Sequence, residues 1–168
     1  MDRTVLEAER SCVEIARGWG LHCGKPLRWE RDCLFVPRFD RMVTPAGVAR
    51  LGLESLCSAL GVAEFGHVFT HEELCRAIAR FSSAPDLDLL EYVSRDVLNL
   101  ALANSDNHGR NTAFLKDGHT VRLSPIFDLA PRVRSLLGTS LVCGLPAPVV
   151  ERCRPRWEVL AQDMETTA

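Results

Sequence analysis

Residues 86–103, DLDLLEYVSRDVLNLALA, constrain the fold more than any other segment of the chain. Their apolar residues recur at helical spacing and cover almost the whole surface near the end of the segment. A helix of this kind is buried on most sides, so we expect one long central helix. The residues expected to point inward are Leu90, Val93, Val97, Leu100 and Ala101.

Three further helices are predicted before this one. Residues 4–19 place apolar side chains on one helical face, namely Val5, Ala8, Cys12, Ile15, Ala16 and Trp19. A second helix is predicted over residues 53–60, where Gly61 can end it. Thr70 and Glu73 form the capping-box pattern T-x-x-E, which predicts the start of a third helix containing Leu74, Ile78 and Phe81 on one face.

Two segments favour β structure. Residues 33–41 contain a short apolar run broken by Pro37, which is typical of an edge strand that enters a loop. Residues 112–123 contain two strand-like runs around Asp117-Gly118, a strong signal for a tight hairpin. The predicted fold class is therefore mainly α with a small β-hairpin.

Composition limits the classes of function. With 168 residues, 46% of them hydrophobic, the chain can form one domain with a continuous core. A formal charge of -2 gives no overall basic field, so neither direct nucleic-acid binding nor membrane-surface binding is expected. Seven cysteines without a C-x-x-C pair favour reduced thiols, and the N-terminus lacks an export signal, so we expect a cytoplasmic protein.

The segment densest in polar and ionisable residues, NSDNHGRN at residues 104–111, directly follows the long helix. Taken alone, it would more often be a polar turn, because Asn and Asp hydrogen-bond to their own backbone. Phosphoryl transfer, however, needs a carboxylate beside the attacking hydroxyl and oxygen ligands for magnesium. Asp106 and Asn111 have the spacing of the aspartate and asparagine in kinase catalytic loops. Asp128 in LSPIFDLAP, just past the predicted hairpin, is a candidate for the second magnesium ligand.

NSDNHGRNTAFL, with RLSPIFDLAP behind it, resembles the C-terminal kinase lobe of the HipA family. These proteins are serine/threonine kinases that act as toxins in bacterial toxin–antitoxin modules. EAERSCVEIARGWGL looks like the helix that enters the lobe, VPRFDR like the hinge by the adenine, and LESLCSALGV like the helix after it. The resemblance covers residues 1–131, with the hinge near 33–41, the catalytic loop at 104–111 and the metal-binding turn at 124–128. Residues 132–168 form an unmatched tail punctuated by prolines.

The resemblance implies a protein-kinase-like C-lobe that uses ATP and Mg²⁺ to phosphorylate a protein serine or threonine. It makes Asp106 the catalytic base and makes Asn111 and Asp128 the ligands of magnesium beside the nucleotide. It also implies that His108 supports the geometry of the loop. The expected partners are a protein substrate and a HipB-like antitoxin.

At the hinge, the resemblance implies that Phe39 and the neighbouring backbone border the nucleotide base. Asp40 and Arg41 are further contributors to the same nucleotide site. These assignments follow from the family pattern alone.

A kinase of this family also needs a phosphate loop and a lysine that pairs with the phosphates, both before the helix at residues 4–19. We therefore expect an incomplete chain, produced by truncation, a frameshift, gene decay or a split kinase. The alternative is a catalytically silent lobe that binds an N-lobe subunit or an antitoxin. A small-molecule phosphotransferase would share the D-x-x-x-x-N pattern, but the hinge and LSPIFD segments support it less.

A zinc site at His67, His71 and Cys75 is less favoured than a partly exposed helix start, because no fourth ligand is evident.

Overall fold

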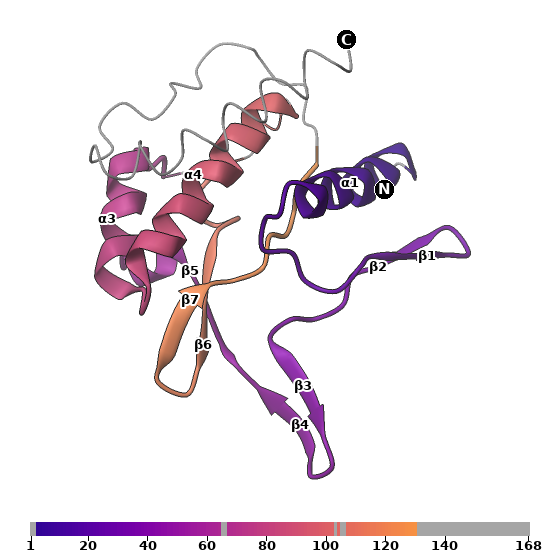
Figure 1. The fold of residues 1–168 in the computed structure, drawn as a ribbon, viewed down its shortest axis with the longest axis horizontal. Helices are drawn as coiled ribbons and strands as arrows, with labels where there is room; N and C mark the ends of the chain where they lie inside the picture. The colour runs from indigo at the N-terminus through magenta and orange to yellow at the C-terminus, as the bar shows by residue number, and fades with distance from the viewer. Residues whose placement is uncertain (1–2, 65–66, 103, 105–106, 131–168) are drawn as a thin grey trace.

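The computed structural model describes residues 3–64, 67–102, 104 and 107–130 (Figure 1). Residues 3–55 contain one helix and five short strands, which are α1 (Arg3–Gly18), β1 (Arg28–Glu30), β2 (Cys33–Phe35), β3 (Arg41–Thr44), β4 (Gly47–Arg50) and β5 (Gly52–Ser55). The remaining elements are α2 (Leu56–Ala59), α3 (His71–Phe81), α4 (Pro85–Ala101), β6 (Ala113–Asp117) and β7 (Thr120–Leu123).

Helix α4 is the centre of the fold, as its sequence predicts, and lies between two apolar clusters. The first cluster joins α4 to α2, α3 and the β6–β7 hairpin through buried residues that include Leu56, Ile78, Leu89, Tyr92, Val93 and Phe114. The second joins the end of α4 to α1 through Cys12, Val13, Ala16, Leu21, Leu27, Leu98 and Leu129. Packing on both sides therefore fixes the position of α4, to which the segments before and after it are attached.

The predicted inward face of α4 is only partly correct. Of the five residues expected inside, Val93 is buried, Leu90 is half-buried against the first cluster, and Ala101 is exposed. The fully buried positions include polar residues that were not expected there, namely Asp88, Ser94, Arg95, Asp96 and Asn99. They are buried because this face of α4 meets the polar loops that follow the helix and the hairpin.

A similar correction applies to α1. Cys12 and Ala16 are buried as predicted, together with Val13, which was not on the predicted face. Val5 and Ile15 were expected inside, but they are 43% and 41% exposed. Helical periodicity correctly located the helix, whereas the contacts of α1 with residues 21–27 and 129 set its orientation.

The start of the predicted helix over residues 53–60 is wrong. Residues 52–55 form strand β5, which pairs antiparallel with β6 so that Ser55 lies opposite Ala113. Only Leu56–Ala59 is helical, and the Ser55 hydroxyl caps it by accepting a hydrogen bond from the Ser58 N–H at 3.2 Å. The strand depends on pairing with residues far along the chain, which local periodicity does not detect.

Two local signals are confirmed. The Thr70–Glu73 capping box is formed at the start of α3, where Leu74 and Ile78 are buried. The hairpin β6–β7 turns at Gly118, which has φ +56°, and pairs Asp117 with Thr120. Both patterns work because their hydrogen bonds join residues only three apart in sequence.

The described residues contain more β structure than predicted, with a three-stranded sheet β5-β6-β7 and two separate hairpins, β1–β2 and β3–β4. The edge-strand prediction for residues 33–41 is confirmed at Cys33–Phe35, which form β2 of a two-stranded sheet. The β1–β2 hairpin lies beside α1, where Arg3 pairs with Asp32, whereas the β3–β4 hairpin extends away from the helices (Figure 1). In the part of the chain described here, no helix is both long and apolar enough to cross a membrane.

Candidate active site

The loop after α4 is anchored first at the end of that helix. Asn104 is buried, and its backbone N–H donates to the Asn99 carbonyl at 2.8 Å. Its side-chain Nδ2 also donates to Asn99 Oδ1 at 2.8 Å. A few residues further on, the Asn107 side-chain Nδ2 donates to Asp96 Oδ1 at 2.7 Å. The polar face of α4 therefore positions this loop through side-chain amides.

Backbone contacts with α2 hold the second half of the loop. The Thr112 carbonyl accepts from the Leu56 N–H at 2.9 Å, and the Gly109 carbonyl accepts from the Cys57 N–H at 3.2 Å. The Asn111 N–H closes the turn by donating to the His108 carbonyl at 2.9 Å. The loop thus satisfies the first N–H groups of α2, which a helix leaves unpaired.

Gly109 lies where the loop touches the core. A β-carbon at this position would lie 3.2 Å from Cys57 Sγ, 3.2 Å from Leu74 Cδ2 and 3.3 Å from Phe69 Cδ2. Three side chains from two different segments would have to move together to accommodate it. This close approach keeps the loop against α2 and α3.

Replacement of Gly109 by alanine is therefore expected to lower the free energy of unfolding by about 1–3 kcal/mol, as overpacking of a core does. Gly18→Ala is the matched control, because a β-carbon there meets nothing within 4 Å. That substitution should leave stability unchanged or raise it by up to about 1 kcal/mol. Urea unfolding followed by circular dichroism measures both. Equal effects of the two substitutions would contradict the proposed packing at Gly109.

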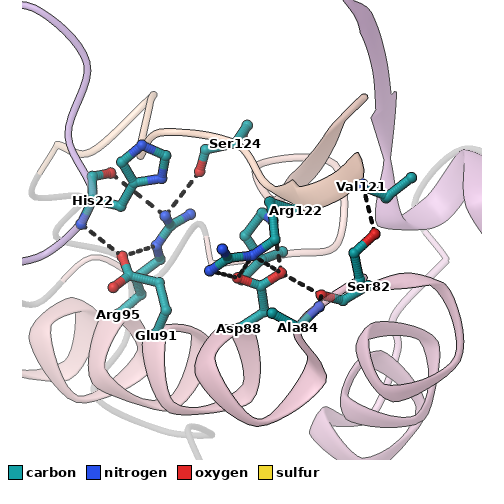
Figure 2. Close-up of polar contacts among 11 residues, drawn as sticks. His22, Ser82, Ala84, Asp88, Glu91, Arg95, Val121, Arg122 and Ser124 are labelled. Carbon is teal, nitrogen blue, oxygen red and sulfur yellow. Dashed lines mark hydrogen bonds and ion pairs between the residues drawn. The ribbon is translucent and has the colours of Figure 1, made fainter. Parts of the chain in front are cut away.

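The segment after β7 is anchored to α4 by two polar groups (Figure 2). The Arg95 guanidinium donates to the Ser124 carbonyl at 2.8 Å and to Glu91 Oε1 at 2.9 Å. The second group centres on Asp88, whose carboxylate accepts from the Leu123 N–H at 3.0 Å and from Arg122 Nε at 3.0 Å. The turn that leads to Asp128 is therefore attached to the same face of α4 as the loop at 104–111.

Asp128 adopts a left-handed backbone conformation, with φ +54°. This region is uncommon for residues other than glycine, and aspartate is one of those that tolerate it. The segment before it is held by the Ile126 N–H, which donates to the His22 carbonyl at 2.8 Å. Burial, and secondarily the negative charge of Asp128, raise the pKa of Glu9 on α1. Asp128 is itself exposed and lies near Glu9 of α1.

The two anchored segments together form a small polar cavity, which we call the loop cavity. Asn111 and Asp128, the two predicted magnesium ligands, both line it. Three more asparagines line the same space, namely Asn99, Asn104 and Asn107. Carboxylate and amide oxygens are the ligands that magnesium prefers, and magnesium usually takes one or two protein carboxylates together with water and phosphate oxygens. The residues present therefore include the ligand types that magnesium takes, and the cavity, of about 20 Å³, has room for a single ion or water.

Asp106 lies outside the described residues. None of the other predicted site residues, Phe39, Asp40 and His108, lines this cavity. His108 is exposed and lines a different cavity. The Phe39 ring contacts Phe127, with ring centroids 5.9 Å apart, so the predicted hinge segment lies against the residue before Asp128.

Asp40 is buried, with 2% of its surface exposed, and forms ion pairs with Arg38 and Arg41. Arg38 Nε donates to Asp40 Oδ1 at 2.7 Å. The hydrogen bond from Arg38 and the two positive charges lower the pKa of the Asp40 carboxyl, although burial opposes this. The Asp40 carboxylate thus stabilises the hinge backbone in this structure.

Sequence reasoning missed the polar network behind the loop. Asp96 Oδ1, which accepts from Asn107, also lies 3.6 Å from His71 Nε2. His71 Nδ1 in turn lies 2.8 Å from the Tyr92 hydroxyl. Burial raises the pKa of Asp96, while His71 and the Asn107 hydrogen bond oppose this. The signal was present in the sequence, because Asp88, Asp96 and Asn99 are polar residues at helical spacing in an otherwise apolar segment.

His71 does not combine with His67 and Cys75 into a metal site. Across residues 3–64, 67–102, 104 and 107–130, no group of three or more His, Cys, Asp or Glu side chains could hold a metal ion. His71 is instead oriented by Tyr92 and Asp96.

The arrangement of a buried central helix, a polar loop, a hairpin and an aspartate behind the hairpin is that of a kinase-like lobe. The family model of the HipA-like C-terminal domain matches residues 2–165. The chain belongs to this family, which confirms the resemblance seen in the sequence. The match continues past residue 131, where the sequence analysis found no resemblance.

Individual relatives agree with this assignment. The protein named "Putative kinase Y4mE" from Sinorhizobium fredii (strain NBRC 101917 / NGR234) is 32% identical over 111 residues, which cover 61% of this chain and 26% of that protein. The HipA structure from Shewanella oneidensis MR-1, solved with HipB and operator DNA, superposes with TM-score 0.65 and 20% identity. That likeness covers 76% of this chain and 34% of the HipA chain.

A second solved structure, the proinflammatory kinase CtkA of Helicobacter pylori, matches with TM-score 0.52 and 18% identity. It covers 73% of this chain and 46% of that one. At these identities the two structures establish a kinase-like fold. Because the chain spans 26% of Y4mE and 34% of HipA, the activities and partners of the whole proteins are proposals for it.

Proposed function

We propose that this chain supplies the catalytic lobe of an ATP- and magnesium-dependent serine/threonine protein kinase of the HipA type. The observation that carries the proposal is that Asn111 and Asp128, from two separate segments, line one small polar cavity anchored on α4. A polar turn without function would not require the segment after β7 to meet the loop after α4. The printed name of the relative Y4mE and the kinase-like fold support the same conclusion.

In the proposed mechanism, Asp106 accepts the proton of the acceptor hydroxyl, and Asn111 and Asp128 hold magnesium. Bound magnesium neutralises the charge that develops on the transferred phosphoryl group. Asn104 and Asn107 fix to α4 the described residues on either side of the proposed base. His108 supports the turn because its backbone carbonyl accepts the hydrogen bond from the Asn111 N–H.

At the hinge, we propose that Phe39 borders the adenine and that Asp40 positions the hinge backbone through its two arginine partners. The contact of Phe39 with Phe127 supports this, because it links the hinge with the residue before Asp128. A cytoplasmic location and a protein substrate are part of the same proposal. A HipB-like antitoxin is a proposed partner, since the similar HipA structure was solved with HipB and operator DNA.

Binding of ATP in the presence and absence of magnesium tests the proposal. It is measured by titration calorimetry on the purified chain, alone and with the product of the reading frame immediately upstream. Asp128→Asn and Asn111→Ala should each weaken the magnesium-dependent affinity by about tenfold or more, because the first removes the negative charge of a ligand and the second removes an oxygen ligand of the metal. Asp117→Asn, an exposed acidic position at the hairpin turn, is the control and should change nothing. Absence of magnesium-dependent binding in both preparations would refute the proposed function.

A second candidate is a silent kinase lobe that binds an N-lobe subunit or an antitoxin. The observation in its favour is the exposure of large apolar residues on and beside the N-terminal hairpins, namely Phe35, Val36, Met42, Val43 and Val48. Asp106→Asn separates the two candidates. It should abolish phosphoryl transfer without loss of ATP binding if the lobe is catalytic, whereas a silent lobe shows no transfer in either form.

A further inference from the structure

Asp96 is a buried carboxylate on α4 that has no role in the function proposed above. The residue is 2% exposed, and its Oδ1 accepts a hydrogen bond from the Asn107 side-chain Nδ2 at 2.7 Å. Burial of a carboxylate costs free energy unless hydrogen-bond donors or cations face it, and here Asn107 supplies a donor. The donor belongs to the loop at 104–111, directly after the proposed base in sequence.

The Asp96 carboxylate fixes the orientation of the Asn107 amide. An ionised carboxylate only accepts hydrogen bonds, whereas an amide carries two donors on Nδ2 and an acceptor, Oδ1, beside it. Asp96 therefore selects the orientation in which Nδ2 faces α4 and Oδ1 is turned away from the carboxylate. Asn107 lines the loop cavity together with Asn111 and Asp128. The orientation of this amide thus sets which polar atoms Asn107 brings to the wall of the cavity.

Two further residues hold the Asp96 side chain itself. His71, the first residue of α3, lies with its Nε2 3.6 Å from Asp96 Oδ1 and its Nδ1 2.8 Å from the Tyr92 hydroxyl. Because the carboxylate only accepts, a proton on Nε2 is favoured, and Nδ1 then accepts from the Tyr92 O–H. Tyr92 is buried and also lines the loop cavity. A chain of contacts from Tyr92 through His71 and Asp96 to Asn107 therefore joins α3 and α4 to the loop.

We propose that Asp96 is a positioning residue for the proposed active site. It holds Asn107 in one orientation and, through Asn107, keeps the loop that carries Asn111 in the arrangement that binds magnesium and ATP. The proposal rests on the proposed kinase function and adds a residue that acts without touching metal or nucleotide. Within the described part of the chain, Asp96 is not one of the residues that line the loop cavity, so its effect passes through Asn107.

Hydrogen exchange tests the attachment of the loop without any nucleotide. Asp96→Leu keeps a similar volume but removes the acceptor. The Asn111 amide, which bonds within the loop, and the Cys57 amide, which bonds to the Gly109 carbonyl, should then exchange about tenfold faster or more. The amides of residues 12–16 in α1, which belong to the second apolar cluster, are the internal reference and should change less. Equal acceleration at all these amides, or none, overturns the proposal.

Calorimetric titration with ATP tests the effect on the site. Asp96→Leu should weaken the magnesium-dependent affinity by about fivefold or more and leave the affinity measured without magnesium unchanged, a selectivity that a general loss of stability does not produce. Asp96→Asn retains an acceptor oxygen for Asn107 and should restore most of the affinity. Asn107→Leu should weaken binding as much as Asp96→Leu, and the double variant no more than either, because both remove the same hydrogen bond. Additive losses overturn the proposal.

Ser94→Ala is the matched control. It removes another buried hydrogen bond from α4, the one that the Ser94 hydroxyl donates to the Leu90 carbonyl at 2.8 Å, and should change neither the exchange of the loop nor the ATP affinity. Melting temperatures show whether each variant is folded. If Asp96→Leu does not fold, Asn107→Leu, at a half-buried position, decides the question, and unchanged loop exchange in that variant overturns the proposal.

The two proposals fail separately. Absence of magnesium-dependent ATP binding by the wild-type chain refutes the kinase function, and the exchange of the loop amides then decides whether Asp96 holds the loop. Magnesium-dependent binding by the wild-type chain that Asp96→Leu leaves unchanged refutes the positioning role and leaves the kinase function standing.

Discussion

Replacement of Arg95 by methionine is expected to lower the free energy of unfolding by about 3–5 kcal/mol, because it removes one partner from a buried ion pair. The Arg95 side chain is 5% exposed and that of Glu91 is 15% exposed. Methionine fills a similar volume but leaves the Glu91 carboxylate without its charged partner and the Ser124 carbonyl without its donor. Both groups lie where the turn before Asp128 meets α4 (Figure 2).

Urea unfolding followed by circular dichroism measures this loss. Arg76→Met, at an exposed position on α3, is the matched control and should change stability by less than about 0.5 kcal/mol. The double variant Arg95→Met with Glu91→Leu should be more stable than Arg95→Met alone, because the orphaned charge is removed. A loss below about 1 kcal/mol for Arg95→Met would mean that this pair contributes little to the attachment of the turn.

Asp88→Ala is expected to lower the free energy of unfolding by about 2–4 kcal/mol. The Asp88 carboxylate accepts from the Ser82 hydroxyl at 2.6 Å, from Arg122 and from the Leu123 N–H, which is buried. Alanine leaves that N–H without an acceptor. The cost is lower than for Arg95, because the Arg122 side chain is 41% exposed and water can solvate it.

The control for Asp88 is Asp86→Ala, which removes an exposed carboxylate from the same first turn of α4. Its effect should stay within about 0.5 kcal/mol, the amount that a favourable helix-dipole interaction contributes at an exposed position. Asp88→Asn retains one acceptor oxygen and should fall between wild type and Asp88→Ala. If Asp86→Ala and Asp88→Ala destabilise the chain equally, the Asp88 hydrogen bonds are not what joins α4 to β7.

The site could be predicted from sequence to the extent that it follows a motif. The spacing of Asp106 and Asn111 and the position of Asp128 after a hairpin indicated a kinase-like loop, and the two described members of this set, Asn111 and Asp128, do line one cavity. The roles of the six candidate residues are still predictions, which the ATP-binding experiment addresses. The network of Asp96, His71 and Asn107 was not predicted, because each residue alone is compatible with a solvated surface.

The fold shows the same division between local and distant interactions. The capping box at Thr70 and the turn at Gly118 were predicted correctly, because their hydrogen bonds close within a few residues. Strand β5 was predicted as helix, because it exists through pairing with β6, whose residues lie about sixty positions away in the sequence. Propensity is a weak guide wherever tertiary contacts decide between helix and strand.

By itself, the sequence determined where α1, α3 and α4 and the β6–β7 hairpin lie, and the family to which the chain belongs. Only the tertiary structure decided which faces of α1 and α4 are buried, that residues 52–55 form a strand, and that Asn111 and Asp128 line one cavity. The physical reason is that periodicity and capping are properties of neighbouring residues. Burial of a charged residue such as Asp88 or Arg95 depends instead on hydrogen-bond partners supplied by a distant segment, here residues 122–124.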